Sequence, residues 1–154
     1  MPTLEREAEV RARADALFWL MQDYGQRLRR DPFLKEARLL GEAQLAARGE
    51  RAWCVDRAGR GMETEYVSFD PPRRVAVRMT RGPWLLRRFA GSWIYEPLGP
   101  DRTRVRFRYH LALRWRIPGT EGLVLRFFAR EMQKRLDALV HAVETGQVLS
   151  AAPA

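Results

Sequence analysis

The chain has 154 residues, of which 46% are hydrophobic, and its formal net charge of +9 comes almost wholly from arginine. This size and composition predict one domain with a single core and exclude a chain that is disordered as a whole. No apolar run approaches the roughly 18 residues of a membrane span, and the first residues lack a secretory apolar segment, so we expect a cytoplasmic protein.

The N-terminal part predicts one strand and two short helices. Residues Leu4–Ala12 alternate between apolar and charged side chains, as in a half-exposed strand. The period becomes helical from Ala14, with Asp15 or the residue before it at the start. A second short helix or turn is expected to reach about Arg30, because the residue before a proline is pushed out of helical space and Asp31-Pro32 follows.

Six consecutive strands are predicted next: Phe33–Gln44, Arg51–Arg57, Met62–Phe69, Arg74–Arg81, Leu85–Glu96 and Thr103–Arg116. Gly49 and Gly59-Arg60-Gly61 supply turns between them. In the fifth strand, Gly91 shares a face with large aromatic residues, which suggests a bulge or a close approach by another group. The last strand is long and alternates strictly, so it must curve to fit one domain.

The last element is a long helix over Thr120–Gly146. Thr120 is expected to cap its start and Gly146 to end it in a left-handed conformation. Glu131 and Arg135 are spaced as an i,i+4 ion pair, which is worth about 0.2–0.5 kcal/mol. One apolar stripe follows the helical period: Leu125, Phe128, Met132, Leu136, Leu139 and Val143.

This order of elements predicts an α+β fold. Strands joined by short turns pair as an antiparallel meander, and the C-terminal helix is the element long enough to cover one face of the sheet. The sheet would then curl around that helix and leave space between them. We expect one domain over residues 1–147 and a flexible tail over 148–154.

Several stretches resemble the helix-grip superfamily of START-like proteins, also called SRPBCC, which includes polyketide cyclase/dehydrase-like proteins. Gly82-Pro83-Trp84 with Leu86, the stretch Gly91-Ser-Trp-Ile-Tyr-Glu-Pro-Leu98 and Val105-Arg-Phe-Arg-Tyr109 look like the pattern of coenzyme-Q-binding START-like proteins. The resemblance covers about residues 3–146. It implies a curved antiparallel seven-stranded sheet, in the order β-α-α-β6-α, wrapped around the C-terminal helix.

The resemblance also implies that the first and last strands lie side by side and antiparallel. The acidic face of Glu5, Glu7 and Glu9 would then meet the basic face of the last strand, formed by Arg104, Arg106 and Arg108. Opposite charges across strands contribute about 0.2–1 kcal/mol per pair. Because paired arginines attract phosphate poorly, this arrangement argues against specific nucleic-acid binding.

No nucleophile motif, phosphate-binding loop, dinucleotide fingerprint or zinc motif occurs in the sequence. His110 and His141 fall on polar faces and are most simply surface residues. The single Cys54 excludes an internal disulfide and is most simply a small strand residue. We therefore expect no metal site and no cofactor.

Aromatic residues form the candidate ligand site. Buried tyrosine and tryptophan need partners for their polar atoms, and pockets for apolar ligands combine aromatic walls with few polar groups. Trp115 also alternates onto this face. The residues predicted to line a cavity between sheet and helix are Trp53, Tyr66, Met79, Phe89, Trp93, Tyr95, Phe107, Tyr109, Phe128, Met132 and Leu136.

In the aromatase/cyclase members of the superfamily, polar and cationic groups in the cavity promote enolisation and dehydration of a poly-β-ketone. The matching strand here offers Tyr66 and Ser68 as inward polar residues but no arginine, and Arg81 and Arg87 are candidate substitutes. No catalytic residue is assigned on this ground.

Three functions remain open from the sequence. The first is binding of a hydrophobic small molecule, such as an isoprenoid quinone, a lipid or a polyketide-like aromatic. The second is a polyketide cyclase/dehydratase, and the third is a regulator that contacts a ribosome or an anionic membrane surface through weak basic contacts. The sequence leaves the oligomeric state open.

Overall fold

The computed structural model describes residues 3–24, 31–32, 34–41, 45–115 and 117–145. The described elements are β1 (Thr3–Val10), α1 (Ala14–Gln22), β2 (Leu34–Leu39), β3 (Arg51–Asp56), β4 (Gly61–Asp70), β5 (Arg74–Arg81), β6 (Leu86–Gly99), β7 (Arg102–Leu113) and α3 (Thr120–Glu144). No helix within these ranges is both long enough and apolar enough to cross a membrane.

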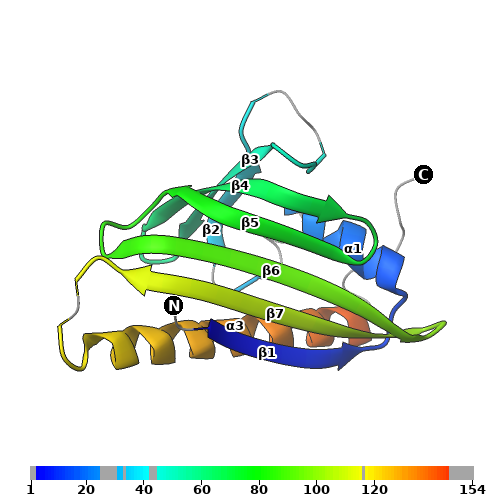
Figure 1. The fold of residues 1–154 in the computed structure, drawn as a ribbon. Coiled ribbons are helices and arrows are strands. Elements are labelled where there is room, and N and C mark those ends of the chain that lie inside the picture. Colours follow the sequence, from blue (N-terminus) through cyan, green and yellow to red (C-terminus); the bar gives the residue numbers. More distant parts are fainter. Residues whose placement is uncertain (1–2, 25–30, 33, 42–44, 116, 146–154) are drawn as a thin grey trace.

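The strands form one antiparallel sheet in the order β1-β7-β6-β5-β4-β3-β2. Figure 1 shows the curved sheet with α3 along the side of β1 and β7, and with α1 at the end of the sheet opposite the connection from β7 to α3. This arrangement confirms the predicted helix-grip fold. The first strand closes the sheet against the last one, as the family resemblance implied.

Alternation along the central strands decides what is buried. On β7, Val105, Phe107 and Leu111 are at most 1% exposed, while the arginines between them face outward. Met132, Leu136 and Leu139 of α3 are fully buried against this layer, together with Leu17 and Phe18 of α1. The core therefore lies between the inner faces of β6 and β7 and the helices α1 and α3.

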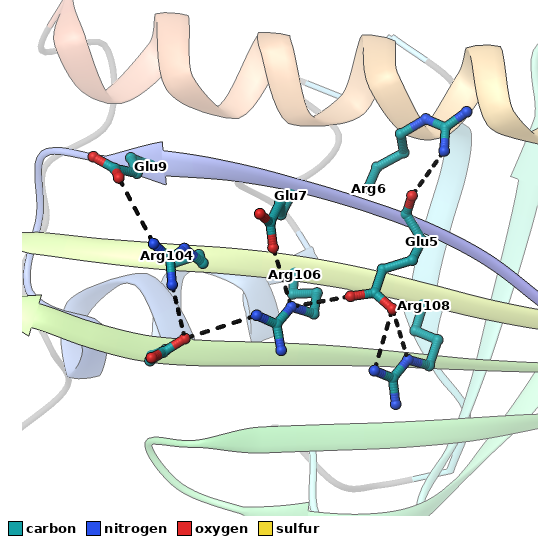
Figure 2. Close-up of polar contacts among 8 residues, drawn as sticks. Glu5, Arg6, Glu7, Glu9, Arg104, Arg106 and Arg108 are labelled. Carbon is teal, nitrogen blue, oxygen red and sulfur yellow. Dashed lines mark hydrogen bonds and ion pairs between the residues drawn. The ribbon is translucent and has the colours of Figure 1, made fainter.

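The predicted charge pairing between the first and last strands is confirmed. The register places Glu5 opposite Arg108, Glu7 opposite Arg106 and Glu9 opposite Arg104. Arg106 Nε lies 3.1 Å from a Glu5 oxygen and 3.2 Å from Glu7 Oε2, and Arg108 lies 3.2 Å from Glu5 Oε2. Figure 2 shows these side chains bridging the two strands on the outer face. We call this set the β1–β7 charge ladder.

Several predicted boundaries differ from the structure. The strand expected over Phe33–Gln44 ends at Leu39, just before Gly41 with φ of 82°, and the last strand ends at Leu113. β6 is longer than predicted and ends at Gly99. Residues 25–30 of the second predicted helix, Gly146 and the tail 148–154 lie outside the described residues.

The start of α3 also differs from the prediction. Gly119, with φ of 84°, is the N-cap residue instead of Thr120, because the tight turn out of the preceding connection needs a left-handed conformation that glycine adopts at low cost. Glu131 pairs with Lys134 at 3.4 Å instead of with Arg135, which turns inward to Asp31.

Candidate functional site

A cavity of about 860 Å³ lies between the sheet, α1 and α3. Its wall is mostly apolar and takes side chains from β2 to β7 and from α1 and α3. The apolar and aromatic residues of the wall include Met21, Leu34, Met62, Val75, Val77, Leu86, Phe89, Trp93, Tyr95, Tyr109, Val124, Phe127, Phe128 and Met132.

The aromatic part of the wall arises from the alternation of β6 and β7. Phe89, Trp93 and Tyr95 share the inner face of β6 with Gly91, which pairs with Tyr109 of β7. A Cβ atom on Gly91 would lie 3.4 Å from the Tyr109 ring. A side chain at Gly91 would therefore meet the Tyr109 ring at an ordinary van der Waals distance, and the register shifts between β6 and β7 lie at Leu86/Arg88 and Pro97/Gly99 and not at the predicted position Gly91.

Seven of the eleven residues predicted for the cavity lie in its wall: Tyr66, Phe89, Trp93, Tyr95, Tyr109, Phe128 and Met132. Rings in this group contact one another, with Phe89 and Tyr109 centroids 5.0 Å apart and Phe89 and Phe128 centroids 5.9 Å apart. The structure thus brings together one aromatic wall from β4, β6, β7 and α3.

Trp53, Met79, Phe107 and Leu136 lie outside the wall among the described residues. Cys54 of β3 lines the cavity, so Trp53 beside it points to the other face, where its ring covers Gly61. Met79 packs toward Gly82 at the end of β5.

Phe107 and Leu136 belong to the filled core instead. They are 1% and 0% exposed, and the Phe107 ring contacts Trp93 with centroids 5.8 Å apart. Trp115, also predicted to face inward, is 48% exposed because β7 has ended before it.

One polar cluster of the wall is centred on Tyr66. The Tyr66 hydroxyl donates to Gln22 Oε1 at 3.1 Å, so it accepts the hydrogen bond it shares with the Tyr24 hydroxyl. The Gln22 amide in turn donates to the carbonyl of Phe18 in α1. These contacts fix three polar side chains at the end of the cavity covered by α1.

A second polar cluster is centred on Arg135 of α3. Arg135 Nε donates to Asp31 Oδ2 at 2.8 Å, and its Nη1 donates to the Tyr109 hydroxyl at 2.8 Å. Arg135 is 9% exposed and Asp31 is 3% exposed, so this is a buried ion pair. The guanidinium holds the Tyr109 hydroxyl in the cavity wall, where both residues can offer hydrogen-bond donors to a ligand oxygen.

A third cluster ties the β3–β4 turn to the start of α3. Asp56 Oδ1 accepts from the backbone N–H groups of Ala58 and Arg60, and Asp56 Oδ2 accepts from Arg60 Nε at 2.8 Å. The Arg60 guanidinium lies 5.1 Å from the centroid of the Phe127 ring. Asp56, Arg60 and Phe127 all line the cavity, so this cluster connects two parts of its wall that are far apart in the sequence.

Sequence reasoning missed the polar residues that matter most here, namely Gln22, Tyr24, Asp31 and Arg135. A signal for Arg135 was present, because it falls on the apolar side of α3, three residues after Met132 and four before Leu139. An arginine in that place needs a buried acidic partner. Nothing in the local pattern indicates that the partner is Asp31.

The polar residues that were predicted instead lie elsewhere. Arg81 and Arg87 are exposed, and neither belongs to the cavity wall among the described residues. Ser68 also lies outside the wall, because the register of β4 shifts between Tyr66 and Ser68. His110 bonds to the Thr3 hydroxyl on the outer face, and His141 is exposed.

Residues 1–144 match the family model described as polyketide cyclase / dehydrase and lipid transport. No curated protein matches the sequence.

Solved structures share the fold at low identity. Zhui aromatase/cyclase from Streptomyces sp. R1128 has a TM-score of 0.79 at 16% identity, with 99% of each chain covered. A START superfamily protein from Mycobacterium smegmatis has a TM-score of 0.79 at 15% identity, covering 93% of this chain and 97% of that one. The di-domain ARO/CYC protein BexL of the BE-7585A biosynthetic pathway has a TM-score of 0.81 at 20% identity. The match with BexL covers 97% of this chain and 48% of BexL, so this chain spans about half the length of BexL.

Proposed function

The chain belongs to the polyketide cyclase/dehydrase and lipid transport family, and from this premise we propose that it binds a hydrophobic small molecule between the sheet and α3. The observation that carries the proposal is the cavity of about 860 Å³ with its aromatic wall. Pockets for small organic ligands are typically about 300–1,000 Å³ and combine apolar walls with a few placed polar groups.

The polar clusters favour an aromatic ligand that carries oxygen functions. The hydroxyl of Tyr109 and the guanidinium of Arg135 provide hydrogen-bond donors in a mostly apolar wall, and a ligand with oxygen functions can accept from them where a plain hydrocarbon cannot. Rings of Phe89, Trp93 and Phe128 give flat surfaces for an aromatic ligand. A polyketide-like aromatic therefore fits better than a long isoprenoid or acyl chain, and the aromatase/cyclase name of Zhui supports this choice.

The proposal is tested by placing a large side chain in the cavity from one position of β4 and, as a control, the same side chain at an exposed position of that strand. Thr64 of β4 lines the cavity, whereas Val67 of the same strand is 38% exposed and lies outside the wall described above. We expect Thr64→Trp to weaken binding of a tricyclic hydroxyanthraquinone probe by about tenfold or more, measured by calorimetry. Val67→Trp should bind like the wild type.

Two outcomes count against the proposal. Equal affinity of the probe for Thr64→Trp and the wild type would place binding outside this cavity. Tight binding of a long-chain fatty acid or an isoprenoid quinone, with no binding of the hydroxyanthraquinone, would overturn the polyketide-like ligand class but keep the cavity.

A second candidate function is cyclisation or dehydration of a poly-β-ketone, and the hydrogen bond from Arg135 to Tyr109 favours it. These reactions remove a proton from a carbon between two carbonyl groups while negative charge develops on the carbonyl oxygen. Donors fixed in a water-poor wall stabilise that oxygen without rearranging.

Turnover separates the enzyme from the binding protein. If the chain is an enzyme, Tyr109→Phe keeps the ring and removes the donor, so kcat for a poly-ketone mimic should fall by roughly 10²–10⁴-fold with little change in KM. Tyr66→Phe is the companion variant for the other cluster. Absence of turnover by a wild type that still binds the hydroxyanthraquinone would leave binding as the function.

A further inference from the structure

Large apolar side chains lie exposed around one end of the cavity. Trp84 is 63% exposed, Trp115 48%, Ile117 58% and Leu123 66%. Trp84 and Leu123 also belong to the cavity wall, so the cavity opens to solvent among these residues. We call the four residues the apolar rim.

The rim is one surface built from separate segments. It takes residues from the β5–β6 connection, the β7–α3 connection and the first turn of α3, which Figure 1 draws at the same end of the molecule. The Trp84 and Trp115 rings contact each other with centroids 4.5 Å apart. Arg114 fixes this pair, because its backbone N–H donates to the carbonyl of Leu85 and its Nε donates to the carbonyl of Trp84 at 2.7 Å.

Exposed arginines flank the rim. Arg81, Arg87 and Arg88 border the β5–β6 connection. Residues 81–88 and 114–123, which include the whole rim, contain five arginines and one acidic residue, Glu121. Within the described ranges none of these three arginines forms an ion pair, whereas those of the β1–β7 charge ladder are paired with glutamates. These three arginines therefore place positive charge beside the rim, as Arg73 and Arg74 do at the other end of β5.

We propose that the apolar rim docks onto the surface of an anionic lipid bilayer, with the opening of the cavity facing the membrane. Tryptophan rings are favoured at the boundary between headgroups and acyl chains, and aliphatic side chains such as Ile117 and Leu123 gain by entering it. Arginines beside them attract acidic headgroups. Docking in this orientation gives an apolar ligand a path between bilayer and cavity that avoids water.

The geometry favours lipid over nucleic acid. Trp84 and Trp115 meet edge to face, at 63° between ring planes, so they do not form a parallel platform on which bases stack. The aliphatic part of the rim adds nothing to base stacking but adds area for insertion into lipid. This inference goes beyond ligand binding and stands whichever ligand occupies the cavity.

The electrostatic part is tested by co-sedimentation with phosphatidylcholine vesicles with and without phosphatidylglycerol. Each arginine near an anionic surface contributes about fivefold in affinity, so Arg87→Glu/Arg88→Glu should weaken binding to the anionic vesicles by roughly 30-fold or more. Arg73→Glu/Arg74→Glu is the matched control, because this exposed arginine pair lies at the other end of β5. It should lose much less binding.

The apolar part is tested by insertion. Brominated phosphatidylcholine mixed with phosphatidylglycerol should quench tryptophan emission of the wild type, and Trp84→Ser/Trp115→Ser should bind these vesicles about tenfold more weakly. Leu45→Ser, which removes a 60% exposed leucine of the β2–β3 connection, is the control and should behave like the wild type.

Three results would overturn the proposal. The first is no binding to anionic vesicles. The second is equal loss of binding in the rim variants and their controls, which would indicate unspecific attraction by net charge. The third is binding of the wild type to RNA instead of anionic vesicles, with an affinity for RNA that Trp84→Ser/Trp115→Ser does not change.

Discussion

At the scale of single residues, Arg135 changes the character of the cavity. It stands on the buried side of α3 and reaches both Asp31, before β2, and Tyr109 on β7. A buried guanidinium is tolerated only with a charged, hydrogen-bonded partner, since the cost of removing it from water is several kcal/mol. The same contacts that satisfy Arg135 therefore fix Asp31 against the helix and Tyr109 in the cavity wall.

We predict that Asp31→Asn lowers the free energy of unfolding by about 3–5 kcal/mol, measured by urea denaturation, because the guanidinium loses its charged partner while staying buried. Asp31→Leu combined with Arg135→Met should recover most of that loss, since neither charge remains. Glu36→Gln, which breaks the exposed pair with Arg38, is the control and should change stability by at most about 0.5 kcal/mol. An equally small effect of Asp31→Asn would contradict a buried ion pair.

At the scale of elements, the β1–β7 charge ladder explains how a chain with so much arginine closes its sheet. Glutamates at every second position of β1 meet arginines at every second position of β7, so a slip by one residue would place the two sets of charges on opposite faces and pair none of them. The ladder opposes a one-residue slip more than it adds stability, because its side chains are largely solvated.

We predict that Glu5→Gln/Glu7→Gln/Glu9→Gln lowers the free energy of unfolding by about 1–2 kcal/mol in low salt and by less in high salt, where exposed pairs are screened. Thermal unfolding at two salt concentrations measures this.

Asp70→Asn/Asp101→Asn/Glu144→Gln changes the net charge equally on exposed residues outside the ladder. If it destabilises the chain as much as the ladder variant does, net charge and not pairing is responsible.

At the scale of the whole molecule, the large apolar side chains on the inner side of the sheet and of α3 divide between a filled core and an open cavity. Phe107 and Leu136 pack between β7 and α3, while Phe89, Tyr109 and Phe128 face the cavity. A fold that keeps about 860 Å³ open loses the packing stability that side chains would supply there. A bound ligand restores part of it, so ligand binding and stability are linked.

We predict that the hydroxyanthraquinone at 100 times its Kd adds about 2.7 kcal/mol to the free energy of unfolding, which raises Tm by roughly 5–10 °C for a chain of this size. Differential scanning fluorimetry measures the shift. Thr64→Trp at the same ligand concentration should reduce the shift to about half or less, because its binding is about tenfold weaker or more, and Val67→Trp should retain the full shift. An undiminished shift in Thr64→Trp would place the ligand elsewhere.

The sequence by itself determined the order of the elements, the inner and outer faces of the strands and, through the family resemblance, the neighbours of β1. Alternation and helical spacing are local properties, so Phe89, Trp93, Tyr95 and Met132 could be assigned to the inner side without knowing the fold.

Only the tertiary structure decided which inward residues meet the cavity and which fill the core. That division depends on where the curved sheet separates from α3, and no local pattern reports the distance between two elements. For the same reason Asp31 as the partner of Arg135, and Trp115 as a neighbour of Trp84 on the exposed rim, emerged from the fold alone. A contact between residues far apart in the chain is set by how the elements pack and not by the spacing within either of them.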